Sequence, residues 1–137
     1  DELFDAWCVT LEMPASPITP LVQAGVAALV ADRCAAGALL LGPVHPYTAA
    51  TDWTGASLRT EQDGVVIAEG GVDALVDPAD VCARDFLVEA LRRGFRPAPG
   101  QWISTGGLTP CVPFREGAEI AIFFRDEPVI RFTVGSN

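Results

Sequence analysis

The sequence predicts an α+β domain that is rich in strands and has one long and one shorter helix. Apolar and polar residues alternate in several short segments, as they do in strands with one buried face. Residues 77–94 instead have a helical period, with apolar side chains on one face and charged side chains on the other. With 137 residues in the chain, we expect a single domain over residues 1–137 with its own core.

The first part of the chain predicts two strands separated by the shorter helix. Residues 6–13 are β-prone, and three prolines in the next seven residues end this strand because proline cannot continue a ladder. An alanine-rich helical pattern then begins at Thr19, a candidate N-cap, and stops at Gly37. Residues 38–42 predict a buried strand, and residues 43–55 predict a polar loop.

The second part predicts a hairpin, the long helix and three further strands. Residues 57–70 have Asp63-Gly64 at their centre, the preferred pair for a two-residue type I′ hairpin. We expect Asp77 to cap the long helix and Gly94 to end it. The remaining strands are expected at residues 101–107, 118–125 and 128–134, with a turn near Asp126-Glu127.

The composition argues against several classes of partner. Nine arginines stand against eighteen acidic residues, and there is no lysine, so the net charge is −9. Without a basic stripe, we expect neither nucleic acid nor an anionic membrane surface as a partner. No apolar run approaches the roughly 18 residues that span a bilayer, and no signal peptide opens the chain. We therefore expect a soluble, cytoplasmic protein.

The sequence gives little support for catalysis by histidine or for metal binding by cysteine. The only histidine, His45, stands between prolines with no acid or nucleophile at a useful spacing. The four cysteines are far apart, lack CxxC pairing and lie in apolar surroundings, as in reduced proteins. Neither a zinc site nor hydrolysis through a histidine base is expected.

Two carboxylates are candidates for a functional site. Glu12 ends an apolar strand before a proline-rich loop, a position from which a carboxylate can point into a cleft. The alternative is an exposed glutamate at the end of a strand. Asp32 is an acid within an otherwise apolar helix. It has either a functional role or a structural one, as a solvated residue or as an ion-pair partner of Arg33 or Arg59.

The stretch QWISTGGLTPCVPF, residues 101–114, contains paired glycines between two threonines. Glycines at the end of a strand allow a ligand to approach the backbone closely, or they relieve strain in a bulge. Both interpretations remain open at Thr105, Gly106 and Gly107.

Five segments resemble, in order and spacing, the 2-keto-4-pentenoate hydratase and 4-oxalocrotonate decarboxylase group of the fumarylacetoacetate hydrolase superfamily. They are WCVTLEMPASP, LVADRCAAGALLLGP, WTGASLRTEQDGVVIAEGG, DPADVCARDFLVEALRRGFRPAPGQWISTGGLTPCVPFREGAEI and RFTV. Together they cover essentially the whole chain but correspond to about the second half of a family member. The apolar pattern is already running by Phe4, so we expect further sequence before Asp1.

The resemblance implies a mixed, strongly bent β-roll, usually oligomeric, that acts on small 2-oxo or 2-hydroxydienoic acids. Family members hold Mg²⁺ or Mn²⁺ with three carboxylates, and the cation stabilises an enolate before water adds or CO₂ leaves. By this resemblance Glu12 is the third metal carboxylate, and Asp32 is the catalytic aspartate beside the substrate. Thr105 and Gly106 resemble the stretch that lines the substrate pocket, where bare backbone amides bind an anion.

The chain also departs from the family pattern. The first two metal carboxylates belong to an E-x-E strand that has no counterpart here, and one carboxylate cannot hold Mg²⁺. An asparagine and a serine of the family are replaced by Arg33 and Ala35, and a G-H-P segment is replaced by V-D-P at residues 76–78.

Three hypotheses follow from these departures. The chain is part of a lyase, completed by a second chain that carries the missing half, by further copies of itself, or by both. Alternatively, it is a metal-free family member of changed chemistry, such as an isomerase or cyclase, in which Arg33 holds the substrate carboxylate. The third hypothesis is a non-catalytic subunit that binds a partner. A C–C hydrolase of the wider superfamily would need a His-Glu pair that the sequence lacks.

Overall fold

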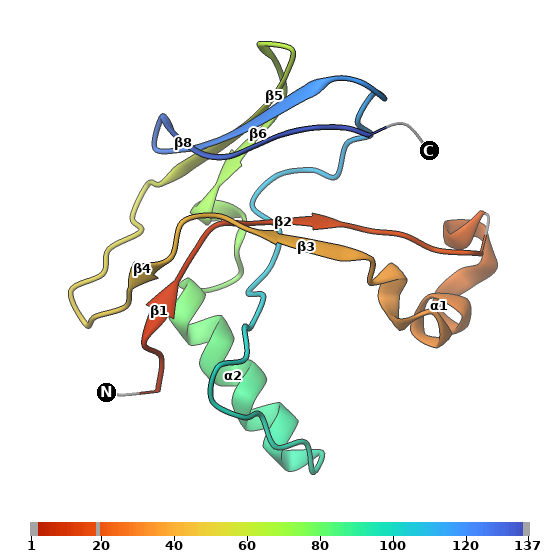
Figure 1. Cartoon of the computed structure of the whole chain (residues 1–137). Coiled ribbons are helices and arrows are strands. Elements are labelled where there is room, and N and C mark those ends of the chain that lie inside the picture. The colour runs from red at the N-terminus through yellow and green to blue at the C-terminus, as the bar shows by residue number, and fades with distance from the viewer. Residues whose placement is uncertain (1–2, 19, 136–137) are drawn as a thin grey trace. The chain divides into compact units, whose positions relative to one another are not determined.

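The computed structural model of the chain combines helices with antiparallel sheets and confirms the predicted α+β class (Figure 1). It describes residues 3–18 and 20–135. The chain forms two units, residues 1–49 and residues 50–137, which are described separately below. The single domain expected from the sequence stays a prediction. Among the described residues, no helix combines the length and apolar character needed to cross a membrane.

The first unit contains two small antiparallel sheets, in which β1 pairs with β4 and β2 pairs with β3. The strand predicted over residues 6–13 is therefore split into β1 and β2. His45 belongs to a short strand rather than to the predicted loop, and its ring stacks on Trp7 with centroids 4.7 Å apart. The strands are β1 (Ala6–Trp7), β2 (Thr10–Met13), β3 (Ala38–Leu41) and β4 (His45–Pro46).

Helix α1 (Leu21–Ala31) is shorter than predicted and is kinked at Gly25, where φ is +84°. It ends before the predicted stop at Gly37 because a 3₁₀ turn, η1 (Arg33–Ala35), follows with left-handed backbone angles. The predicted N-cap, Thr19, lies outside the described residues.

The second unit is built on a four-stranded antiparallel sheet with the order β6-β5-β7-β8. Asp63 and Gly64 both have positive φ, +51° and +77°, which confirms the predicted hairpin turn. The last turn lies at Arg125-Asp126, one residue earlier than predicted, and also has positive φ at both positions. The strands are β5 (Ser57–Gln62), β6 (Val65–Gly71), β7 (Glu119–Phe124) and β8 (Glu127–Thr133).

The two faces of this sheet differ in character. One face carries the buried core, with Ile120 and Ile122 of β7 almost completely excluded from solvent. On the other face the Arg59 guanidinium lies 4.0 Å from the centre of the Phe123 ring. The same guanidinium bonds to Glu61 at 2.8 Å and to Asp126 at 2.6 Å, and these bonds raise its pKa. One face of the sheet therefore carries the buried core, and the other carries a cluster of charged and aromatic side chains.

Helix α2 (Ala79–Arg92) follows a 3₁₀ turn, η2 (Val72–Ala74), and matches the predicted long helix. The prediction that Asp77 caps it is wrong, because Pro78 occupies the N-cap position and no side chain caps the helix. The predicted end at Gly94 is confirmed, with φ at +80°. The N–H groups of Gly94 and Phe95 donate to the carbonyls of Leu91 and Ala90 at 3.0 and 2.8 Å, a Schellman motif.

Candidate functional site

In the first unit, the end of β2 lies against the turn that follows α1. The N–H of Ala15 donates to the carbonyl of Ala35 at 2.9 Å. Gly37 packs so closely that an added Cβ would lie 2.3 Å from the carbonyl oxygen of Met13. Figure 1 shows α1 beyond this end of the β2 and β3 pair. Backbone contacts therefore hold the two candidate segments of the first unit together.

These contacts bring the segments of Glu12, Asp32 and Arg33 to the same end of the small sheet. Glu12 is exposed on β2 and lies opposite Leu39 of β3 in the register. Asp32 is the C-cap residue of α1, and its N–H donates to the carbonyl of Ala28 at 2.9 Å. Arg33 follows directly and is exposed. The arrangement places two carboxylate residues and one guanidinium residue on neighbouring segments.

The side chain of Asp32 has an unsatisfied oxygen. Its Oδ2 atom is buried and has no hydrogen-bond partner among the residues that the structure describes. Arg59, which the sequence offers as an ion-pair partner of Asp32, belongs to the second unit and bonds there to Glu61 and Asp126, so that pairing stays a prediction. A buried carboxylate oxygen without a donor costs roughly 1–3 kcal/mol or more. Such an oxygen is ordinarily satisfied by a hydrogen-bond donor, an ordered water or a cation.

The turn after Asp32 is strained. Arg33, Cys34 and Ala35 have φ values of +54°, +57° and +59°. A left-handed conformation costs a residue with a Cβ roughly 1–2 kcal/mol, and such strain is concentrated at functional sites. Nothing in the sequence indicated this turn, because none of the three residues is glycine or asparagine. The strain and the unsatisfied carboxylate together mark this turn as the candidate site.

Substituting Cys34 by glycine is expected to raise the free energy of unfolding by about 0.5–1 kcal/mol. Glycine relieves the left-handed strain, which outweighs the extra entropy of the unfolded chain. The neighbouring Ala36 has φ at −59°, so Ala36→Gly is a matched control that should be destabilising by about 0.5–1 kcal/mol. Urea unfolding of the three proteins measures both changes. A loss of stability in Cys34→Gly as large as in the control would contradict the strained turn.

In the second unit, the strand predicted over residues 101–107 is absent, and the segment has no regular structure. The backbone just after this segment is bonded to the end of β6, since the N–H of Gly71 donates to the carbonyl of Leu108 at 3.0 Å. An added Cβ at Gly70 would lie only 2.0 Å from the same carbonyl oxygen. The segment therefore crosses the end of β6 instead of extending the sheet.

The predicted contacts Thr105 and Gly106 lie on this irregular segment. Thr105 is half-buried, and Gly106 is exposed with φ at +130°. An added Cβ at Gly106 would lie 2.9 Å from Cδ2 of Leu75. The positive φ favours glycine at position 106, whereas the Leu75 side chain could move aside; a Cβ at Gly107 would have only the carbonyl oxygen of Thr109 nearby, at 3.7 Å. Open backbone is found at Gly107 rather than at Gly106.

The expected site residues fall into two groups. Glu12, Asp32 and Arg33 belong to the first unit, and Thr105 and Gly106 belong to the second. Within residues 3–18 and 20–135, no three His, Cys, Asp or Glu side chains are grouped so that they could hold a metal ion. The residues of this chain that are described do not form a complete site for Mg²⁺ or Mn²⁺.

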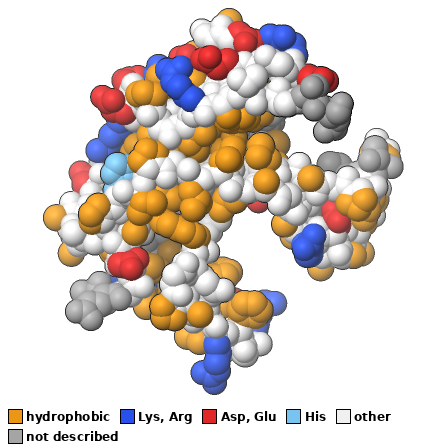
Figure 2. All heavy atoms as spheres, in the orientation of Figure 1, with side chains coloured by type: hydrophobic (Ala, Val, Ile, Leu, Met, Phe, Trp, Pro, Cys, Tyr) orange, Lys and Arg blue, Asp and Glu red, His pale blue; other side chains and the backbone are white. Residues whose placement is uncertain are grey.

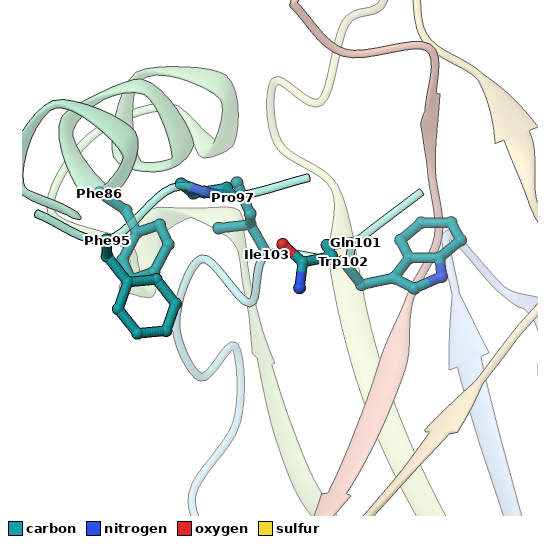
Figure 3. A pocket seen from close by; sticks show the side chains of 6 residues that line it. All are labelled: Phe86, Phe95, Pro97, Gln101, Trp102 and Ile103. Atoms are coloured by element: carbon teal, nitrogen blue, oxygen red, sulfur yellow. The ribbon is translucent and has the colours of Figure 1, made fainter. Parts of the chain in front are cut away.

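A hollow that sequence reasoning missed lies at the C-terminal end of α2 (Figure 3). Its volume is about 150 Å³, and its walls are mainly aromatic and aliphatic. The Oε1 atom of Gln101 accepts a hydrogen bond from the N–H of Ala98 at 2.7 Å, which fixes the loop beside it. The lining residues are Phe86, Phe95, Pro97, Gln101, Trp102 and Ile103.

Comparison with protein-family models found no match for this chain, and comparison with curated proteins found none either. The family resemblance therefore stays a hypothesis that rests on the sequence segments given above.

Proposed function

We propose that the chain is part of a lyase of the hydratase or decarboxylase type that acts on small 2-oxo or 2-hydroxydienoic acids. One observation carries the proposal: the end of β2, which bears Glu12, lies against the strained turn that begins after Asp32. Asp32, whose Oδ2 atom is buried without a hydrogen-bond partner among the described residues, directly precedes the exposed Arg33 in the sequence. The resemblance assigns functional roles to Glu12 and Asp32 independently of this geometry. We also propose the bent β-roll of the family as the fold of the chain, with Thr105 and Gly106 as substrate contacts.

The residues of this chain would divide the chemistry between them. Arg33 would bind the carboxylate of the substrate, since a planar guanidinium matches that group with two parallel hydrogen bonds. Asp32 would carry a proton between the 2-hydroxyl oxygen and carbon, so that a dienol becomes a 2-oxo enoate of unchanged composition. In a hydratase, water then adds across the remaining carbon–carbon double bond.

The metal site would be shared. Glu12 is exposed on β2 and would supply one carboxylate to Mg²⁺ or Mn²⁺. The other carboxylates would come from a second chain that carries the missing half of the family pattern, and the whole would be an oligomer. Hard oxygen ligands suit both cations.

Glu12→Gln is expected to weaken Mn²⁺ binding at least about tenfold, because it removes one anionic ligand from the shared site. The measurement is a Mn²⁺ titration followed by electron paramagnetic resonance, on the protein purified together with any chain that accompanies it. Glu69→Gln is the matched control, since Glu69 is also an exposed strand glutamate. Turnover is followed by the loss of dienoate absorbance. Equal Mn²⁺ affinity in the two variants would contradict the metal role of Glu12.

A second candidate function is a metal-free isomerase or cyclase in which Arg33 holds the substrate. The exposed guanidinium in a strained turn favours it. On this alternative, turnover would survive chelation and Glu12→Gln but would be lost in Arg33→Ala. If the wild-type protein turned over neither 2-oxo acids nor 2-hydroxydienoic acids, the hypothesis of a non-catalytic subunit that binds a partner would remain.

A further inference from the structure

The hollow at the C-terminal end of α2 is bordered by three large aromatic residues of the second unit. Phe86 belongs to α2, and Phe95 and Trp102 belong to the segment that follows the helix. The three residues are exposed to 51 %, 68 % and 44 %. Figure 2 shows hydrophobic side chains at the surface where α2 lies in Figure 1. Single exposed apolar residues need no explanation, but large ones around a hollow are typical of a binding site.

The size of the hollow limits what it can hold. Its volume is about 150 Å³, and its walls are mainly aromatic and aliphatic (Figure 3). A cavity of this size with apolar walls holds a molecule as large as benzene, whereas pockets for drug-sized ligands have roughly 300 Å³ or more. Aromatic walls favour an aromatic occupant, because contacts between rings add to the free energy of burying their area. The hollow therefore suits a single aromatic ring.

Gln101 supplies a polar group to the lining of the hollow, and its orientation is fixed. Its Oε1 atom accepts a hydrogen bond from the N–H of Ala98 at 2.7 Å, and its own N–H donates to the carbonyl of Ala98 at 3.3 Å. A backbone N–H bonds only to an acceptor, so the first of these bonds determines which side-chain atom is Oε1 and which is Nε2. The Nε2 group is therefore the donor that Gln101 can offer to a molecule in the hollow.

We propose that the hollow binds a small molecule that consists of one aromatic ring and an acceptor oxygen attached to it, as in a carbonyl or carboxyl group. The ring packs against the aromatic walls, and the oxygen accepts a hydrogen bond from Nε2 of Gln101. An occupant that covers this amide without accepting the bond leaves a donor unsatisfied, which is costly. A hydrocarbon ring, or an apolar side chain of a partner protein, is therefore a weaker occupant.

The first test compares acetophenone with 2-phenylpropene, in which a CH₂ group replaces the carbonyl oxygen and the shape is otherwise the same. Each compound is titrated into the purified chain, and NMR follows the side-chain amide of Gln101 and the indole N–H of Trp102. Acetophenone is expected to bind about threefold to tenfold more tightly, the factor that one hydrogen bond contributes.

The second test uses Gln101→Glu, which keeps an oxygen for the N–H of Ala98 but replaces the Nε2 donor by a second oxygen. In this variant acetophenone should bind no more tightly than 2-phenylpropene, whose own affinity should be unchanged. Gln23→Glu is the matched control, since Gln23 is exposed on α1 in the other unit. It makes the same change of charge and should leave both affinities unchanged. Circular dichroism checks that each variant folds.

Four results would overturn the proposal. If neither compound shifted the Trp102 indole signal up to its solubility limit, the hollow would not be a site for a single ring. If that signal shifted on dilution of the protein alone, a second copy of the chain would occupy the hollow. Equal binding of the two compounds to the wild type would mean that no hydrogen bond orients the ligand. A preference for acetophenone that persisted in Gln101→Glu would exclude Gln101 as the donor. None of these measurements depends on the proposed lyase function.

Discussion

Ile122→Ala is expected to lower the free energy of unfolding by about 3–4 kcal/mol. Ile122 is 1 % exposed in β7 and lies between Thr60 of β5 and Ile130 of β8 in the sheet register. Alanine removes buried methyl and methylene groups and leaves a cavity that the surrounding strands fill only partly. The change removes packing from the centre of the four-stranded sheet.

Chemical unfolding measured by tryptophan fluorescence checks this expectation, because Trp53 and Trp102 belong to the same unit as the sheet. Val65→Ala serves as the control, since Val65 is 65 % exposed on the edge strand β6. Its effect should stay within about 0.5 kcal/mol. If Ile122→Ala were as mild as this control, the core would not lie on the face of the sheet described above.

The sheet of the second unit was predictable because its information is local. Alternating residues identified β7 and β8. The pair Asp63-Gly64 identified the hairpin of β5 and β6, and it adopts the positive φ angles that a type I′ turn requires. The prediction of a strand at residues 101–107 was wrong because the path of this segment depends on a contact with a distant part of the chain. Its neighbour Leu108 is bonded to Gly71 at the end of β6, so a tertiary contact decides the path of the backbone.

The candidate site was predictable only in part. An acid within an apolar helix drew attention to Asp32, and this position has an unsatisfied buried oxygen. The strained turn had no signal, because Arg33, Cys34 and Ala35 are not residues that favour left-handed angles. The close approach of Gly37 to the end of β2 likewise depends on residues far apart in the sequence. Sequence can propose such residues, but their grouping requires the fold.

Gly70→Ala is expected to destabilise the second unit by about 2–3 kcal/mol. The added Cβ would lie 2.0 Å from the carbonyl oxygen of Leu108 and 3.0 Å from its carbonyl carbon. These are backbone atoms, so no side chain can rotate away to make room, and overpacking of this kind costs roughly 1–3 kcal/mol. The segment that leads from Thr105 to Leu108 must move away from β6.

Gly135→Ala is the matched control, because an added Cβ there meets nothing within 4 Å. Urea unfolding gives the loss of stability, and hydrogen exchange locates its cause. The Gly71 amide donates to Leu108, so its exchange should accelerate in Gly70→Ala and remain unchanged in Gly135→Ala. Slow exchange in both variants would mean that the loop bearing Thr105 and Gly106 is not held by β6.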